Sequence, residues 1–202
     1  MVAQARGQYV TPEEYLSGEA ATNTKNEYVD GVIVAMSGAS RQHVTIATNL
    51  VSALTPRMRA GGCRGYTSDM RVRVDTSNRY YYPDYAAVCG KPEFVVLQGV
   101  DSLVNPILIV EVLSDSTEQR DRGEKWLAYW EIETLRAYLL IHQDRRLIEV
   151  RTRDGDGKIW NEIHVVGLEN ALKLINPACE VLLAEIYEDV EFDTDGARRD
   201  QP

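Results

Sequence analysis

The chain has 202 residues, a formal net charge of −9 and 44% hydrophobic residues, the composition of a globular protein with one substantial core. No apolar stretch approaches the roughly 20 residues of a membrane-spanning helix, and the first residues lack the apolar segment of a signal peptide. We therefore expect no membrane partner, no export and a cytoplasmic location. Cys63, Cys89 and Cys179 lie far apart without a CxxC pair, which argues against a zinc knuckle or a disulfide framework.

The charge is unevenly distributed along the chain. From Pro177 to the end, eight acidic residues stand against two arginines, whereas the segment Arg41–Arg79 carries seven arginines and two acidic residues. Arginine at this density suits phosphate or carboxylate recognition, although scattered surface arginines are the simpler explanation. The net charge therefore neither predicts nor excludes a polyanionic partner. We expect a single domain over residues 1–192 and an acidic, disordered tail over 193–202.

The N-terminal part predicts two helices separated by a hairpin. The sequence TPEE from Thr11 combines an N-cap, Pro at the first helical position and Glu at the third, so a short helix should run to about Gly18. Two apolar runs flank Asp30-Gly31 within Asn26–Met36, the signature of a tight β-hairpin. Apolar residues then recur at helical spacing over Arg41–Ala60, and two glycines end that helix.

Strands dominate the middle of the chain. Cys63–Asp75 alternates apolar and polar residues, which predicts a half-exposed strand with a basic polar face, and Arg79–Cys89 is its predicted antiparallel partner. Gly90–Gln98 is expected to be a loop. The apolar run in Pro106–Ser114 predicts a strand that is buried on both faces.

The C-terminal half predicts a parallel crossover and then a meander. A capping box after Asp115 opens a helix to about Glu131, and the next strand is Ala137–His142, so the connection between the two buried strands is a right-handed crossover. The later elements are expected as a hairpin of Leu147–Thr152 and Ile159–Val165, strands at Ala171–Ile175 and Val181–Leu183, and a brief helix at Ala184–Val190. The whole pattern predicts an α/β fold with a mixed central β-sheet flanked by helices.

Two carboxylates on predicted strands are the first candidates for chemistry. Glu111 lies near the end of the buried strand, where a metal ion, a basic side chain or a proton must neutralise it. Asp84 follows Pro83 in an aromatic strand, and Pro83 favours a bulge that redirects side chains. If the strands are neighbours, the two acids suit Mg²⁺ or Mn²⁺. A structural ion pair at Glu111 and a turn residue at Asp84 are the alternative explanations.

Two further charged residues are candidates. Lys125 falls in the helix that follows Glu111, and Glu27 falls in the first hairpin. For both side chains, a solvated surface charge is the simpler explanation.

The chain also resembles a known family, through segments that occur in the same order. These segments are YVTPEEYL, NEYVDGVIVAMSGAS with His43 following, TSDMRVRV, YYYPD, NPILIVEVLSDST and DRGEKWLAY, and they resemble the Uma2 family. The resemblance spans about Tyr9 to Phe192 and rests on the combination of segments. The family is similar to the PD-(D/E)xK nucleases, which implies a restriction endonuclease-like core with elements in the order α-β-β-β-α-β, here with extra C-terminal strands. This order agrees with the elements predicted from Arg41 to His142.

The resemblance implies metal-assisted hydrolysis of phosphodiester bonds. By motif, Asp84 matches the Asp of PD and Glu111 matches the (D/E), so these two carboxylates and the carbonyl of Val112 are expected to hold Mg²⁺ or Mn²⁺. The chain departs from the motif at Leu113, where the lysine is expected. In Uma2-like sequences that lysine has moved to the following helix, and Lys125 is the matching position, where it would position the attacking water.

Further roles follow from the same resemblance. Glu27 is a candidate for holding a second metal ion or a water molecule. His43 is a candidate contact to substrate or to metal-bound water, with a histidine that merely caps its helix as the simpler alternative. Arg71 and Arg73 are candidate phosphate contacts, since an exposed basic strand could lie along a nucleic-acid backbone.

The leading hypothesis is thus a Mg²⁺-dependent endonuclease acting on DNA, and a homodimer would let one site per chain cut both strands. A second hypothesis is an inactive nucleic-acid or protein-binding module that keeps the fold, which the net negative charge and the displaced lysine favour. A glycosidase that uses Asp84 and Glu111 as an acid and base pair is a third. For Trp126 and Trp130, core packing is the simpler explanation, with an interface as the alternative.

Overall fold

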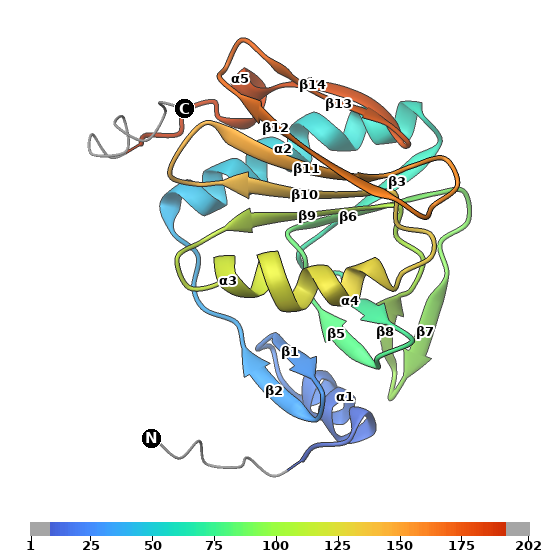
Figure 1. The fold of residues 1–202 in the computed structure, drawn as a ribbon. Coiled ribbons are helices and arrows are strands. Elements are labelled where there is room, and N and C mark those ends of the chain that lie inside the picture. Colours follow the sequence, from blue (N-terminus) through green and yellow to red (C-terminus); the bar gives the residue numbers. More distant parts are fainter. Residues whose placement is uncertain (1–8, 193–202) are drawn as a thin grey trace.

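A computed structural model describes residues 9–192 and contains a central six-stranded sheet in the order β12-β11-β10-β9-β6-β3 (Figure 1). Its strands are β3 (Cys63–Thr67), β6 (Tyr85–Cys89), β9 (Leu108–Leu113), β10 (Ala137–His142), β11 (Leu147–Arg153) and β12 (Trp160–Val166). Within this sheet β9 and β10 are parallel, and the other neighbours are antiparallel. The strands β9 and β10 are buried along their whole length, as their apolar sequences predict.

Helices cover both faces of this central sheet. The crossover helix (118–130) joins β9 to β10 and consists of α3 (Glu118–Arg120), the π-helical turn η1 (Asp121–Lys125) and α4 (Trp126–Trp130). The helix α2 (Arg41–Ala60) packs its apolar side on the opposite face, where β13 (Ala171–Ile175), β14 (Ala178–Leu182) and α5 (Leu183–Ile186) complete the same core cluster. The order α2, β3, β6, β9, crossover helix, β10 confirms the predicted α-β-β-β-α-β core.

A second six-stranded sheet lies on the other side of the crossover helix (Figure 1). Its order is β2-β1-β5-β4-β8-β7, and α1 (Pro12–Ala21) packs on it through Tyr15 and Leu16. Its strands are β1 (Asn26–Val29), β2 (Val32–Ala35), β4 (Val72–Val74), β5 (Arg79–Tyr81), β7 (Phe94–Leu97) and β8 (Val100–Leu103). Valines and Tyr81 of this sheet share one core cluster with Tyr129 of α4 and Tyr138 of the central sheet, so the crossover helix is packed between the two sheets.

Three predictions about the middle of the chain were wrong. The segment Cys63–Asp75 is not one strand but β3 and β4, and Arg79–Cys89 is β5 and β6. The antiparallel pairing was right, but β3 pairs with β6 in the central sheet while β4 pairs with β5 in the other. The expected loop over Gly90–Gln98 contains β7, which pairs with β8 through a turn in which Gln98 and Gly99 have positive φ.

The cysteines also differ from expectation. Cys63 and Cys89 are directly opposite each other in the β3–β6 pairing and form a disulfide, whereas Cys179 is free and buried. Sequence spacing did not reveal this pair because the two strands that carry it are 26 residues apart and meet only in the folded sheet.

Two further expectations concern the C-terminal tail and a membrane-spanning helix. The predicted acidic tail, 193–202, lies outside the described residues. Among the helices of residues 9–192, none has the length and apolar character needed to cross a membrane.

Candidate active site

Asp84 and Glu111 are neighbours across two strands of the central sheet. Pro83 and Asp84 follow β5 and come directly before β6, at the point where the chain passes from one sheet to the other. Tyr85 is paired with Val110, so the antiparallel register carried one residue further sets Asp84 opposite Glu111. The backbone N–H of Val112 donates to Oδ2 of Asp84 at 2.7 Å, which fixes this carboxylate against the end of β9.

Glu111 is a buried acid with a crowded electrostatic environment. Its side chain is only 4% exposed, and Oε1 accepts hydrogen bonds from Nζ of Lys125 at 3.2 Å and from the hydroxyl of Tyr129 at 3.0 Å. Among the described residues no donor contacts Oε2. Burial, together with the charges of Asp121, Asp84 and Glu27, raises the pKa of Glu111 well above its ordinary value, although Lys125 opposes this.

Lys125 is enclosed by three carboxylates. Its ammonium lies 3.0 Å from Oε1 of Glu27, 3.0 Å from Oδ1 of Asp121 and 3.2 Å from Oε1 of Glu111, and the side chain is 6% exposed. Burial alone would lower the pKa of Lys125, but Glu111, Glu27 and Asp121 raise it well above the usual lysine value. The lysine is therefore a permanent cation and cannot serve as a general base near neutral pH.

The π-helical turn η1 presents both Asp121 and Lys125 to this cluster. The two residues are its first and last members, and both are buried. A π-helical turn inside an α-helix widens one turn of the backbone, and such turns are frequent at functional sites. Here the turn supplies two buried, oppositely charged side chains that contact each other at 3.0 Å.

Glu27 reaches the cluster from the second sheet. It lies in β1, its side chain is 4% exposed, and its Oε2 contacts the guanidinium of Arg120 at 3.0 Å. The simpler explanation of Glu27 as a surface charge is therefore wrong. Arg120 also contacts Glu124 at 3.2 Å, so it connects the buried carboxylate to the solvent-facing side of the helix.

His43 completes the site from the first turn of α2. Its backbone N–H is capped by the Ser40 hydroxyl at 3.0 Å, while its ring Nε2 lies 2.9 Å from Oδ1 of Asp84. Burial lowers the pKa of His43, but the hydrogen bond to Asp84 and the charge of that carboxylate outweigh burial and raise it. The ring is thus directed at a candidate catalytic acid.

These side chains line one large cavity. It has a volume of about 1060 Å³, and its walls include His43, Asp84, Glu111, Val112, Lys125 and Glu27. The rest of the wall includes residues of α2 and β2, the segment between β9 and α3, and Lys25, Ser68, Tyr82, Arg120 and Asp121. Asp84, Glu111 and Lys125 thus come from separate segments and face one space.

Arg71 and Arg73 do not form the exposed basic strand that the sequence predicts. Arg71 is 3% exposed, and its guanidinium bonds to the hydroxyls of Ser102 and Tyr15 beside Glu19. Arg73 is largely covered and pairs with Asp75 at 2.9 Å. Because the predicted strand breaks between β3 and β4, the alternation that placed these arginines on one open face does not hold.

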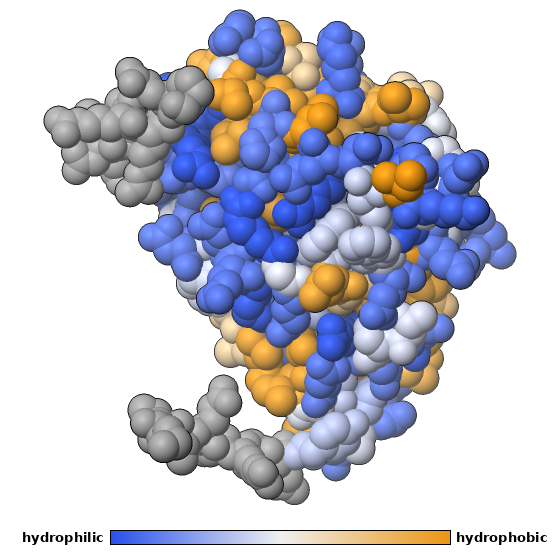
Figure 2. All heavy atoms as spheres, in the orientation of Figure 1, coloured by the Kyte–Doolittle hydropathy of each residue, from blue (hydrophilic) through white to orange (hydrophobic). Residues whose placement is uncertain are grey.

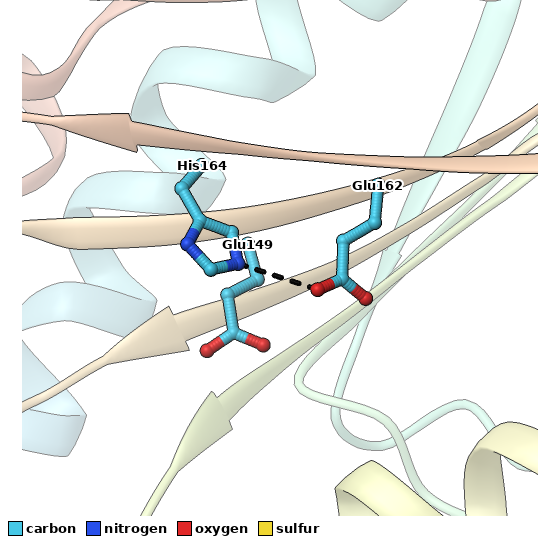
Figure 3. A group of neighbouring side chains, drawn as sticks. All are labelled: Glu149, Glu162 and His164. Carbon is cyan, nitrogen blue, oxygen red and sulfur yellow. Dashed lines mark hydrogen bonds and ion pairs between the residues drawn. The ribbon is translucent and has the colours of Figure 1, made fainter.

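A separate acidic group lies on the outer part of the central sheet. Figure 3 shows Glu149, Glu162 and His164, whose ligand atoms all lie within 4.8 Å of one another. Glu149 is already bonded by Arg122 and by His142, and these partners lower its pKa to about 2 even though burial acts in the opposite direction. Its oxygens are therefore committed to a structural ion-pair network.

Three members of the site had not been identified in the sequence. Asp121, Arg120 and Tyr129 contact Lys125, Glu27 and Glu111 respectively. The spacing of four residues from Asp121 to Lys125 is the one signal that pointed to such a contact, since residues four apart lie on one side of a helix.

Comparisons with known proteins agree with this fold. The family model Uma2, described as "putative restriction endonuclease", matches residues 12–181. Two uncharacterized proteins of Synechocystis are each 33% identical; one match covers 82% of this chain and 90% of the relative, and the other 85% and 95%. A crystal structure from Anabaena variabilis, titled as a putative nuclease of DUF820, superposes with a TM-score of 0.62 at 13% identity, over 88% of this chain and 97% of that one. At this level of identity, the match to the crystal structure shows only that the two chains share a fold.

Proposed function

Because the chain belongs to the Uma2 family, we propose that it is a Mg²⁺-dependent endonuclease that hydrolyses phosphodiester bonds of DNA. The observation that carries this proposal is the meeting of Asp84, Glu111 and Lys125 in one cavity. Metal-assisted hydrolysis of phosphodiester bonds is expected to use two acids and a nearby amine, and here these groups lie at the end of a pair of buried strands.

The residues present fit a divalent cation. Carboxylate oxygens and a backbone carbonyl are the donors that Mg²⁺ and Mn²⁺ prefer. Oε2 of Glu111 has no donor among the described residues, although the side chain lines the cavity. Four carboxyl groups (Glu27, Asp84, Glu111 and Asp121) meet two basic side chains, Lys125 and Arg120, so the acidic groups outnumber the basic ones by two, and burial together with this crowding raises the pKa of Glu111.

In this proposal Asp84, Glu111 and the Val112 carbonyl would hold the metal ion. When bound, the ion supplies positive charge that polarises a phosphoryl oxygen and makes water more acidic. The N–H of Val112 holds the Asp84 carboxylate in place, and the Tyr129 hydroxyl does the same for Glu111.

Lys125 would orient the attacking water and offset the negative charge that develops on the phosphate oxygens. Its raised pKa keeps it charged for this role. Glu27 and Asp121 act as positioning residues, because they fix the ammonium from two sides at 3.0 Å. His43, which contacts Asp84, is placed to orient that carboxylate or to meet the substrate.

A plasmid-cleavage assay with Mg²⁺ or Mn²⁺ tests the proposal. Glu111→Gln and Asp84→Asn should each lose about a hundredfold or more of the cleavage rate, and both should bind Mn²⁺ more weakly. Glu180→Gln is the matched control, because it removes an exposed carboxylate of β14 that does not line the cavity, and it should leave cleavage unchanged. Metal-independent cleavage, or full activity in Glu111→Gln, would overturn the proposal.

The alternative is an inactive binding module that keeps the nuclease fold. Its support is electrostatic: in the cavity Lys25 pairs with Asp69, and Arg120 and Lys125 pair with acids, so no free cation faces a polyanion there among the described residues. Such a module would bind DNA or a partner equally well after Asp84→Asn. We also propose a homodimer, which sedimentation analysis of the full chain would test.

A further inference from the structure

A second pocket lies beside the C-terminal half of the crossover helix and shares no lining residue with the first. It has a volume of about 440 Å³ and lies between α4 and the start of β12. The residues that matter for its chemistry are Trp126, Trp130, Trp160, Arg151, Lys158 and Glu162. In Figure 2, pale and orange side chains gather over α4 and the adjoining end of the β11–β12 hairpin, whereas blue ones cover α3.

All three tryptophans of the chain line this pocket. Trp126 stacks on Tyr138, with ring centroids 5.5 Å apart and an interplanar angle of 15°, and meets the edge of Trp160 at 4.7 Å. Trp130 lies 5.7 Å from Trp126 and is 46% exposed. Two indoles are therefore fixed by their neighbours, and the third offers aromatic surface to solvent.

The charged groups around the indoles leave a positive excess. Arg151 lies over the Trp126 ring at 4.7 Å and is paired with Glu162 at 2.7 Å. Lys158 is exposed, and within residues 9–192 its ammonium makes no ion pair with another side chain. Arg151 and Lys158 would both repel a cationic ligand. The pocket therefore suits a flat aromatic group that carries a negative charge.

We propose that this pocket is a stacking platform for single-stranded nucleic acid. An unpaired base stacks on Trp130 beside Trp160, and Lys158 contacts the adjoining phosphate. The choice of a nucleic acid over another anionic aromatic ligand rests on the proposed nuclease function. Lys125 and Trp126 are consecutive, so a strand held here lies along the same helix that supplies the active-site lysine.

Intrinsic fluorescence tests the platform directly, because every tryptophan of the chain lies in it. The full chain is titrated with an oligothymidylate of eight nucleotides in EDTA, which prevents cleavage, and with a duplex of equal length. We expect the oligothymidylate to quench the fluorescence and to bind more tightly than the duplex. Trp130→Ala should weaken binding on the order of tenfold, and Trp130→Phe should restore most of it. Because Trp130→Ala removes one of the three reporters, affinities of the variants are also measured by anisotropy of a labelled oligonucleotide.

Two further variants separate stacking from charge and from folding. Lys158→Ala should reduce the slope of log affinity against log salt concentration by about 0.7, the contribution of one phosphate contact on a single strand. Leu127→Ala is the control, since Leu127 is 61% exposed on the same helix and does not line the pocket. Binding that is unchanged in Trp130→Ala, or the absence of quenching, would overturn the platform and leave a protein partner as the occupant of this surface.

The outcome is independent of the cleavage assay. The oligothymidylate should still quench the fluorescence of the Glu111→Gln variant as in the wild type, because Glu111 lines only the other cavity. Quenching without metal-dependent cleavage by the wild type would refute the nuclease proposal and keep the platform. Metal-dependent cleavage without quenching would support the nuclease proposal and refute the platform.

Discussion

Nζ of Lys125 lies 3.2 Å from Oε1 of Glu111, and both side chains are almost completely removed from solvent. Burying an ion pair costs as much as it returns unless further hydrogen bonds satisfy both partners. Here Tyr129 adds a bond to Glu111, while Glu27 and Asp121 add contacts to Lys125. A buried cluster with more acidic than basic groups stabilises the fold poorly, and such clusters are typical of cation-binding and catalytic sites.

Replacing Lys125 by Met should destabilise the chain strongly. The change leaves Glu27, Glu111 and Asp121 buried without their common cation, which costs about 3–5 kcal/mol for a broken buried pair. Urea unfolding at pH 7 measures the loss. Lys91→Met, on an exposed loop, is the control and should change the free energy of unfolding by less than about 0.5 kcal/mol. Equal effects of the two variants would show that the cluster contributes nothing.

The pKa of Glu111 predicts a pH dependence of stability. Its pKa is raised in the folded chain above the ordinary value of 4.5, so the folded state holds a proton that the unfolded state releases. The free energy of unfolding should therefore fall as pH rises from about 4.5 through the raised pKa. Glu111→Gln removes this titration, so its curve should be flatter than the wild-type curve in that window. Urea midpoints from pH 4 to 9 provide the comparison, and parallel curves would contradict the expectation.

Thiol titration checks the disulfide. Under denaturing conditions without reductant, one free thiol, that of Cys179, should react; after reduction, three should react. Cys63→Ala combined with Cys89→Ala should lower the free energy of unfolding by about 2–4 kcal/mol. Three reactive thiols in the unreduced protein would show that the pair is not bonded. In that case the double variant should cost only the lost packing of two small side chains.

Two glycines should respond oppositely to alanine. A Cβ at Gly65, in β3, would collide with the ring and hydroxyl of the fully buried Tyr85, so Gly65→Ala should cost about 1–3 kcal/mol. Gly18, inside α1, has nothing within 4 Å of the added carbon, so Gly18→Ala should stabilise by about 0.5–1 kcal/mol. Thermal unfolding of the two variants compares them. A neutral Gly65→Ala would mean that Tyr85 moves aside.

Much of the fold could be predicted from local pattern. The helix Arg41–Ala60 and the strand Ala137–His142 have the predicted bounds, because helical spacing and a continuous apolar run are strong signals. The pairing of β7 with β8 was not predicted, since its turn uses Gln98-Gly99 in place of a strong turn dipeptide. The chain passes between the two sheets several times, among them at Asp69 and at Pro83, and even the bulge predicted at Pro83 did not indicate that the chain changes sheets there.

The site shows the same division. Asp84, Glu111 and Lys125 could be selected by motif and by the cost of burying charge, and the structure brings them to one cavity. The burial of Arg71 could not be foreseen, because its partners Ser102 and Tyr15 are distant in sequence. Long-range contacts of this kind depend on the packing of whole elements and not on the residues that flank a side chain.

Glu27 belongs to one sheet, Asp84 and Glu111 belong to the other, and Lys125 lies on the helix packed between them. Because acids from both sheets contact the same ammonium, a change in either sheet affects the charge balance of the same buried lysine. Replacing the N-terminal hairpin by one without an acid at position 27 would deprive the buried ammonium of one counter-charge, and replacing β9 by a strand without an acid at position 111 would deprive it of another.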